Sequence, residues 1–284
     1  MTKTEIKSTV KKMLRGACAF SAPLFHHISQ MDSQDALALL QKTSPKPDGT
    51  AMGKNSLDAI TCDVQIVIPA YNVEDYLESC MESVLSQKTK FSYHVVLVDD
   101  GAKDRTPQIC DKYAGDPRVT VIHQENRGLS GARNTGMRHL FGRYVLFVDS
   151  DDILCEGAVE GLMETACAGD YDLVEGGALY LIGDRKTTAH RYDADSLVEN
   201  PYEQLHGHAW GKLYKRELLE NLCFPEGYWY EDSLLSFLVF PMAKKIALSR
   251  QVAYGYRINE GGIVKSSVGK PRAVETYWIT EQLL

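Results

Sequence analysis

The chain has 284 residues, of which 44% are hydrophobic and 24% charged, a composition typical of a soluble globular protein that can bury a full core. A formal net charge of −7 argues against a protein whose main task is to bind nucleic acid, so we expect no nucleic-acid partner. The seven cysteines are scattered and contain no Cys-x-x-Cys pair, which indicates neither a disulfide framework nor a zinc site and favours a cytoplasmic protein.

Residues 1–60 differ in composition from the rest and are predicted to be a helical N-terminal extension and linker. Apolar residues recur at helical spacing from Ile6 to Ala17, on a segment that is otherwise rich in lysine and arginine. Two interpretations of residues 1–20 stay open: peripheral contact with the inner face of the plasma membrane, or docking on the chain's own domain. A second short helix is expected over residues 35–40, and no apolar run approaches the roughly 20 residues of a membrane helix.

From residue 61 to residue 176, apolar strands alternate with amphipathic helices. Such alternation predicts an α/β fold with a mostly parallel, Rossmann-like sheet and helices on both faces. No Gly-x-Gly-x-x-Gly follows the first strand, so a dinucleotide fold of the usual kind is not expected. The predicted strands are residues 64–68, 93–98, 119–123 and 144–149, and the predicted helices are residues 73–85, 107 onward and 128–141.

Polar residues follow three of these strands, at Pro69–Asn72, Asp99–Asp100 and Asp149–Asp151. Ligands of such sheets bind at the carboxyl ends of the strands, so the three segments are expected to converge on one site. In an extended backbone Asp149 and Asp151 would face one spot, and their hard oxygens suit Mg²⁺ or Mn²⁺. The alternative is that these aspartates only cap a following helix, as Asp152 would do before Ile153.

Four segments with polar or glycine residues follow one another along this part of the chain: Val67–Asn72, Val98–Thr106, Asn126–Asn134 and Phe147–Asp152. They resemble the successive motifs of the inverting, nucleotide-sugar-dependent family 2 glycosyltransferases with the GT-A fold. The resemblance covers about residues 62–260, and one departure is Ala102, where that family usually has serine.

The resemblance implies a UDP-sugar donor and assigns contacts with its nucleobase to the ends of the first two strands. A carboxylate that accepts a hydrogen bond from the uracil N–H suits uridine better than adenine. These nucleobase contacts are Pro69, Ala70, Tyr71 and Asp100, with Asp99 nearby.

The resemblance also assigns the rest of the donor site. It puts Arg133 near the nucleotide, Asp149 at the ribose or the metal ion, and Ser150 beside them. Asp151 is the first choice as ligand of the Mg²⁺ or Mn²⁺ ion. Arg257, at the end of a later strand, is the residue able to neutralise the donor diphosphate.

Residues 177–284 are predicted to be the smaller, acceptor-binding half of the same catalytic domain. An antiparallel pair is expected over residues 178–182 and 187–192, and loop with a short helix over residues 195–207. His206 and His208 are interpreted as structural, because no third nitrogen or sulfur ligand lies close in the sequence. Trp210–Arg216 resembles the family's next motif, in which a helix packs beside the donor site, with Lys212 near that site.

Glu231 and Asp232 precede an apolar helical segment, which by itself indicates N-terminal capping. The resemblance makes one of the two the general base, with Asp232 preferred over Glu231; both interpretations can hold together. Residues 274–284 form a last helical pattern with no terminator after it.

The predicted reaction is transfer of a hexosyl or N-acetylhexosaminyl group from a UDP-sugar to a hydroxyl of a glycan or lipid-linked acceptor. Bacterial cell-envelope or exopolysaccharide synthesis is the expected setting. Two other classes stay open: a sugar nucleotidyltransferase, and a non-catalytic protein that binds nucleotide sugars or glycans.

Overall fold

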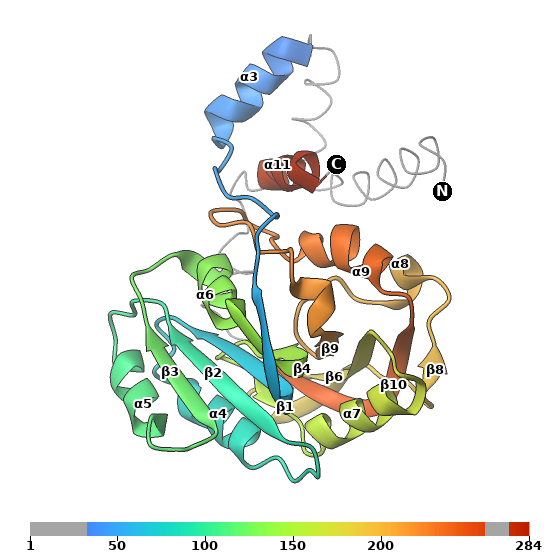
Figure 1. Ribbon diagram of the computed structural model, residues 1–284. Coiled ribbons are helices and arrows are strands. Elements are labelled where there is room, and N and C mark those ends of the chain that lie inside the picture. The colour runs from blue at the N-terminus through green and yellow to red at the C-terminus, as the bar shows by residue number, and fades with distance from the viewer. Residues whose placement is uncertain (1–32, 259–272, 284) are drawn as a thin grey trace.

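A computed structural model describes residues 33–258 and 273–283 of the chain (Figure 1). The basic helix predicted for residues 1–20 lies outside the described residues. The second predicted helix is present as α3 (Ser33–Thr43). Among the described residues, none of the helices is long and apolar enough to cross a membrane.

The first half of the fold alternates strands and helices, as predicted. Parallel strands at its centre are flanked by helices that connect each strand to the next. Its elements are β1 (Ser56–Ala70), α4 (Leu77–Leu85), β2 (Tyr93–Asp99), α5 (Thr106–Tyr113), β3 (Val119–His123), α6 (Gly128–Met137) and β4 (His139–Phe147).

The second half contains shorter and more irregular elements. The predicted antiparallel pair is present as the hairpin of β6 and β7. The elements are β5 (Ile153–Leu154), α7 (Ala158–Gly169), β6 (Leu173–Ile182), β7 (Arg185–His190), β8 (Ser196–Leu197), α8 (Pro201–Gln204), β9 (Lys212–Lys215), a 3₁₀ helix (Arg216–Leu219), a π-helical turn (Leu235–Val239), α9 (Phe240–Met242), β10 (Ile246–Arg257) and α11 (Ala273–Leu283).

One ten-stranded sheet runs through both halves, in the order β3-β2-β1-β4-β9-β6-β10-β5, with β7 paired to β6 and β8 to β10. Strands β3, β2, β1 and β4 are parallel, as the alternation of strands and helices predicts. Strand β9 runs antiparallel to both β4 and β6, so the second half of the sheet is mixed.

The central strands are buried on both faces, which explains their nearly continuous apolar sequences. Alternate residues of β1 enter different clusters: Ile66 and Ile68 pack with α4, α5 and α7, whereas Val67 packs with the end of α6 and the segment after β9. On α4, the residues buried in the first cluster are Leu77, Cys80, Met81 and Val84, the face that helical spacing predicts. The sheet therefore has a separate apolar cluster on each face.

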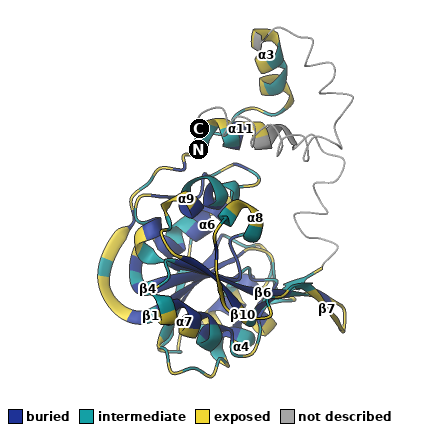
Figure 2. Ribbon diagram, turned by 90° about the vertical axis from the view of Figure 1, so that its right-hand side faces the viewer, coloured by how far each residue is buried: buried dark blue, intermediate teal, exposed yellow. Residues whose placement is uncertain are grey.

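Strand β1 begins before the domain boundary expected after residue 60. Its residues Ser56 and Leu57 pair with β4, and Ala51 is already buried. The first residues of β1 are mostly exposed, whereas its last seven are buried (Figure 2). The exposed start of β1 resembles a linker in the sequence. The boundary expected between residues 176 and 177 falls within β6.

The conformation of the segment Trp210–Arg216 differs from the one that the resemblance implied. The segment was expected to form a helix, but it contains β9, inserted between β4 and β6. Tyr214 and Leu213 are fully buried there and pair with residues of both neighbouring strands. Pairing on both sides overrides local helix propensity, which is a weak preference.

The predicted C-terminal helix is present as α11 and lies beside the chain that leads into β1 (Figure 1). Trp278 Nε1 donates a hydrogen bond to the Ser44 carbonyl oxygen at 2.8 Å. Trp278 and Ile279 also pack against Tyr228, a few residues before Glu231. This contact connects α11 with the segment that carries the candidate base.

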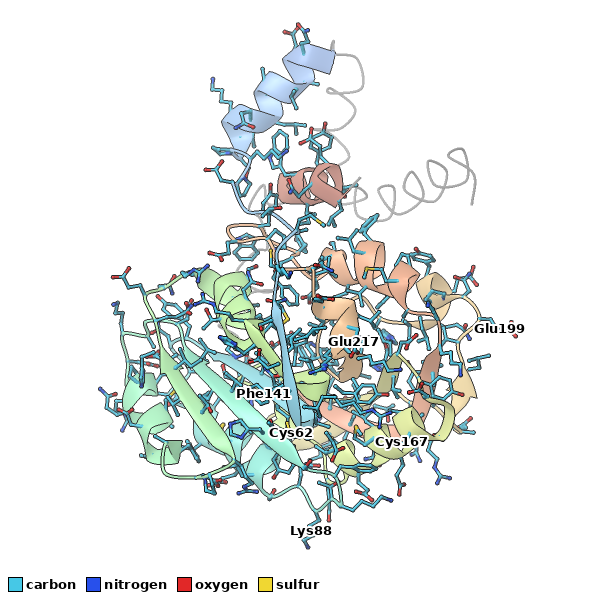
Figure 3. The ribbon with its side chains drawn as sticks, in the orientation of Figure 1. Cys62, Lys88, Phe141, Cys167, Glu199 and Glu217 are labelled. Atoms are coloured by element: carbon cyan, nitrogen blue, oxygen red, sulfur yellow. The ribbon has the colours of Figure 1, made fainter. Side chains whose placement is uncertain are left out.

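The described cysteines are all free, and Cys62 on β1 and Cys167 on α7 illustrate their separation (Figure 3).

Gln65 is the polar exception within the buried part of β1. Its side chain bonds four backbone groups: Nε2 donates to the carbonyls of Gly136 and His139, and Oε1 accepts from the amides of Phe141 and Gly142. It therefore secures the tight connection from α6 to β4, which precedes the central acidic turn.

We predict that Gln65→Leu lowers the free energy of unfolding by about 3 to 5 kcal/mol, because it leaves these buried backbone groups unpaired. The matched control is Gln108→Leu, on the exposed face of α5, with an expected change within about 0.5 kcal/mol. Urea unfolding of both variants measures the difference. Equal midpoints for the two variants would contradict this account of Gln65.

Candidate active site

A single buried guanidinium joins carboxylates from distant parts of the chain. Arg133, on α6, has a side chain that is 1% exposed. Its Nη2 contacts Asp149 Oδ1 at 2.8 Å, and its Nη1 contacts Glu231 Oε1 at 2.8 Å and Asp232 Oδ1 at 2.9 Å. Arg133 was expected near the nucleotide, and the structure puts it between the acidic strand end and the candidate base.

Two neighbours of Arg133 hold the same distant segment. Asn134 forms a reciprocal pair with the backbone of Phe224, since its Nδ2 donates to the carbonyl at 2.8 Å and its Oδ1 accepts from the amide at 2.7 Å. Arg127, just before α6, forms an ion pair with Glu226. Residues 127–134 therefore dock the segment 224–232 on the first half of the sheet.

Asn134 is a functional candidate that the sequence interpretation did not select. It lies in the third of the four matched motifs, directly after Arg133, and that position was the available signal. The two hydrogen bonds between Asn134 and Phe224 fix the start of the segment 224–232, and Arg133 holds its end.

The arrangement concentrates negative charge around one cation. Burial raises the pKa of Glu231 to about 7, with Asp232 adding repulsion and Arg133 opposing both. Burial also raises the pKa of Asp232, against the attraction of Arg133. Burial would lower the pKa of Arg133, but Asp149, Asp232 and Glu231 raise it above its ordinary value, so it stays charged. A carboxylate pair that titrates near neutrality can accept a proton in a reaction.

The acidic segment after β4 forms a turn. The amide of Asp152 donates to the carbonyl of Asp149 at 3.0 Å, so the backbone does not stay extended from Asp149 to Asp151. The expectation that Asp149 and Asp151 face one spot because the backbone between them is extended is therefore wrong. Both aspartates do lie at the end of the central strand. Ser150, expected at the donor, is 5% exposed within this turn.

Asp152 does not cap a helix. Ile153 and Leu154 form β5, and α7 begins only at Ala158. Asp152 instead accepts hydrogen bonds from the Tyr254 hydroxyl at 2.9 Å and from the Arg257 amide at 2.6 Å. Burial raises the pKa of Asp152 to about 8, and Asp149 and Asp151 add to the effect.

Tyr254 is another residue that the sequence interpretation missed. Its hydroxyl accepts from the amide of Asp149 at 3.0 Å while it donates to Asp152, so it braces both ends of the turn. It lies in an apolar strand pattern, where a tyrosine cannot be told from a simple core residue.

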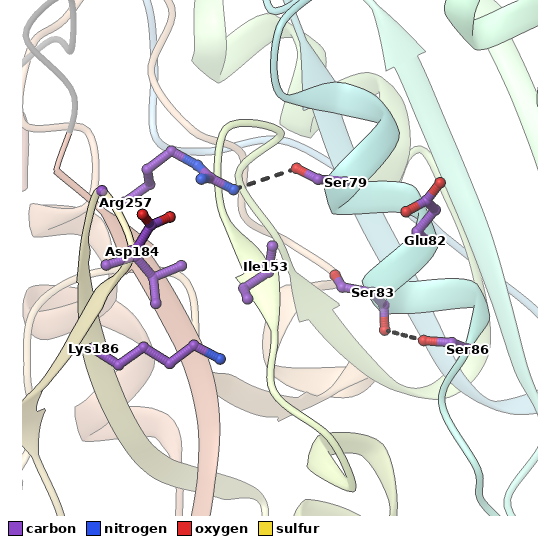
Figure 4. Close-up of a pocket in the computed structure, with 10 residues that line it drawn as sticks. Ser79, Glu82, Ser83, Ser86, Ile153, Asp184, Lys186 and Arg257 are labelled. Carbon is purple, nitrogen blue, oxygen red and sulfur yellow. Dashed lines mark hydrogen bonds between the residues drawn. The ribbon is translucent and has the colours of Figure 1, made fainter.

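Arg257, the predicted diphosphate ligand, lies beside the acidic turn. Its Nε donates to the Asp151 carbonyl at 2.8 Å, and its Nη2 reaches Ser79 Oγ on α4 at 3.3 Å. Figure 4 shows Arg257 at one end of a groove of about 630 Å³ between α4 and the β6–β7 hairpin. Asp149, Glu231 and Asp232 do not line that groove, so we define the site by the carboxylates that converge on Arg133.

The residues predicted to contact the nucleobase lie together at the carboxyl ends of the neighbouring strands β1 and β2. Ala70 is opposite Asp99 in the register of β1 and β2, and the Asp100 amide donates to the Ala70 carbonyl at 2.9 Å. The Val148 amide donates to the Val67 carbonyl at 3.0 Å, which brings the central strand end beside them. Pro69 is buried in β1, whereas Tyr71, just beyond it, is 45% exposed.

Both carboxylates of this edge already have protein partners. Asp99 accepts from the Ala102 amide at 3.0 Å and contacts His123 Nδ1 at 2.8 Å. Asp100 Oδ1 accepts from Gln124 Nε2 at 2.6 Å and from the Arg127 amide at 2.9 Å. These bonds shape the loops around the edge.

Comparison with known proteins gives a consistent family. The sequence profile described as "Glycosyl transferase family 2" matches residues 65–224. "Glycosyltransferase GlyA" of Streptococcus pneumoniae is 36% identical over 70% of this chain and 31% of its own length. "Minor teichoic acid biosynthesis protein GgaB" of Bacillus subtilis is 28% identical over 78% of this chain and 25% of its own. The chain thus spans less than a third of either relative.

Among solved structures, residues 1–349 of S. aureus TarS, crystallised with UDP-GlcNAc, match with a TM-score of 0.64. The match has 24% sequence identity and covers 72% of this chain and 61% of that one. At this identity the likeness identifies the fold alone.

We predict that Arg133→Met lowers the free energy of unfolding by about 3 to 5 kcal/mol at pH 8, because it leaves a cluster of carboxylates without its cation. The loss should shrink at pH 5.5, where carboxyls with raised pKa values take up protons. The surface control Arg127→Met, which breaks one exposed pair, should cost about 1 kcal/mol or less. Denaturant unfolding at both pH values measures this, and a loss independent of pH would count against the charge argument.

Proposed function

The chain belongs to glycosyltransferase family 2 and has the GT-A fold, and on that premise we propose that it transfers a sugar from a UDP-sugar to an acceptor hydroxyl, with inversion at the anomeric carbon. The observation that carries the proposal is the Arg133 cluster. It joins Asp149, at the end of the central strand, to the carboxylate pair Glu231 and Asp232. A donor site and a base beside it are the two parts that such a transfer needs.

We assign the general base to Asp232. Its side chain is 30% exposed, compared with 12% for Glu231, so an acceptor hydroxyl reaches it more easily. Asp232 takes the proton of the hydroxyl as its oxygen attacks the anomeric carbon from the face opposite UDP. No covalent intermediate with the enzyme forms. Glu231 also forms an ion pair with Arg133, and burial raises the pKa of Glu231 to about 7.

The donor set of the acidic turn fits Mg²⁺ or Mn²⁺, because it offers hard carboxylate oxygens without nitrogen or sulfur. We assign Asp151 as the principal ligand and Asp149 as the second, because both lie in the matched motif after β4. Asp152 is committed to Tyr254 and to the Arg257 amide. When bound, the ion supplies Lewis-acid stabilisation of the departing diphosphate. Arg257, beside the same turn, adds a fixed positive charge.

UDP is proposed as the carrier on two grounds. The TarS structure, which shares the fold, was crystallised with UDP-GlcNAc. The edge formed by Pro69, Ala70 and Tyr71 presents Asp100, and a carboxylate retains further acceptor positions after the bonds from Gln124 and Arg127. A hexosyl or N-acetylhexosaminyl group is the proposed cargo.

The proposed acceptor is a cell-envelope glycan or its lipid-linked precursor. The support is the similarity to GgaB, whose description places that protein in minor teichoic acid biosynthesis. A cytoplasmic location, with contact at the membrane through residues 1–20, goes with this acceptor. Membership in a glycosyltransferase family disfavours the nucleotidyltransferase alternative, and the intact set of Asp149, Asp151 and Asp232 disfavours a non-catalytic binding protein.

The first test is calorimetric titration with UDP in the presence and absence of Mn²⁺. We expect binding that strengthens with Mn²⁺, and we expect Asp151→Ala to remove the Mn²⁺ effect because it removes the principal ligand. Asp193→Ala, an exposed aspartate between β7 and β8, is the matched control and should bind as the unaltered chain does. Absence of UDP binding with any divalent ion would reject the proposed donor.

The second test is the pH dependence of UDP release from a UDP-sugar. Because the base acts in its ionised form and burial raises the pKa of Asp232, the rate should rise with pH through a range above that of an ordinary aspartate and then level off. Asp232→Asn should lower the rate by about 10² to 10⁴ and remove this rise. Unchanged UDP binding by the variant is the control for folding. A rate that is flat between pH 5.5 and 8.5 in the unaltered enzyme would exclude this base.

A further inference from the structure

Three histidines from separate segments meet in the second half of the fold. His190 ends β7, and His206 and His208 lie in the loop before β9. Each histidine contributes one ring nitrogen to a group of three nitrogens that all lie within 4.8 Å of one another. The sequence interpretation judged His206 and His208 structural because it found no third ligand nearby. The hairpin supplies one, since β7 pairs with β6 and brings His190 back to the pair.

Two of the rings are held by their other nitrogen. His206 Nδ1 is 2.6 Å from Glu175 Oε1, and His190 Nε2 is 3.2 Å from the Gly176 carbonyl. Each of these nitrogens faces an acceptor, which favours the tautomer that carries its proton there. A carboxylate or carbonyl behind each imidazole is the usual arrangement behind metal-binding histidines.

Glu175 is the anionic centre of this cluster. It is fully buried on β6, and its Oε2 lies 3.1 Å from the ammonium of Lys212, which is also fully buried. The Tyr192 hydroxyl donates to its Oε1 at 2.7 Å. Glu175 therefore anchors the His206 ring, while the ammonium of Lys212 neutralises its charge.

The third ring, His208, already has partners at its Nδ1. That nitrogen lies 3.1 Å from the Trp210 carbonyl and 3.1 Å from Lys212 Nζ. An ion on Nε2 would require the form in which Nδ1 carries the proton and donates to Trp210.

We propose that His190, His206 and His208 form a binding site for a divalent transition-metal ion of the Zn²⁺ type. Imidazole nitrogens select such ions, whereas the oxygen donors of the acidic turn select Mg²⁺ or Mn²⁺, so the two sites differ in chemistry. The proposal does not depend on the proposed glycosyl transfer.

The rings must adjust for an ion to bind. Zinc–nitrogen distances of about 2.1 Å bring the nitrogens of a tetrahedral site to about 3.4 Å from one another. Here His206 stacks on His190 with centroids 3.9 Å apart and planes at 20°. The His206 side chain is 45% exposed, so the ion has a path from solvent. To bind the ion, the His206 ring must leave its stack on His190 while its Nδ1 keeps the contact with Glu175. Water would complete the coordination.

The site lies at the end of an aromatic column that leads to the acidic turn. His208 stacks on Trp210 with centroids 3.4 Å apart, and Trp210 stacks on Tyr254 at 4.4 Å. The hydroxyl of Tyr254 contacts both Asp149 and Asp152. An ion that fixes His208 would therefore also restrain a ring stack that ends beside the proposed donor site.

The test is titration of the full chain with Co²⁺, in the presence of excess Mg²⁺ and a non-thiol reductant, followed by visible absorption and calorimetry. We expect one ion per chain with the intense absorption of tetrahedral cobalt, displaced by Zn²⁺. His206→Gln and, separately, His190→Gln should each weaken binding at least about tenfold. His139→Gln, which alters an exposed histidine outside the cluster, and Asp151→Ala should leave the affinity unchanged.

Several results would overturn the proposal. They are no stoichiometric Co²⁺ binding, equal affinity in the two cluster variants and the His139→Gln control, loss of the ion in Asp151→Ala alone, or an absorption spectrum that shows thiolate ligands from the free cysteines. Thermal unfolding of each variant without metal separates lost ligands from lost fold. A change in Co²⁺ affinity without a change in metal-free melting temperature supports the site.

Discussion

The arrangement of the site depends on one buried cation. Arg133 is the common partner of Asp149, Glu231 and Asp232, which lie far apart in the chain. One guanidinium cannot neutralise three carboxylates, so the cluster holds excess negative charge in a poorly solvated place. Such excess is relieved by a proton, which agrees with the raised pKa values of the pair, or by a bound cation. The same imbalance that costs stability thus prepares the site for proton uptake and for metal.

Much of this was accessible from the sequence. The parallel half follows from alternating apolar runs, and the strand ends at Ala70, Asp99 and Asp149 converge because parallel strands share a carboxyl edge. The prediction that Asp232 or Glu231 is the general base rests on the family resemblance, because the sequence around them shows only a carboxylate pair before an apolar helical segment. Local pattern and motif spacing sufficed wherever the relevant contacts lie within one strand, loop and helix.

The rest required contacts that the sequence does not encode locally. The sequence gives no sign that Arg133 on α6 is buried, since an arginine is usually exposed, and its partners Glu231 and Asp232 lie about a hundred residues away. The strand β9 was missed because sheet pairing on both sides decides its conformation. His190 was not connected with His206 for the same reason, because only the hairpin brings them together. The turn at Asp149 differs from an extended strand through one backbone hydrogen bond, which no side-chain pattern reveals.

The docking of residues 224–232 on α6 separates two tasks within one sheet. The contacts of Arg133 and Asn134 reach across to this segment without involving the β6–β7 hairpin. The hairpin is exposed at its turn and lies against the groove beside α4. Its length and sequence are therefore free to diverge while the reacting groups keep their positions. A change in the length of the hairpin would therefore alter the groove beside α4 without moving the carboxylates that Arg133 holds.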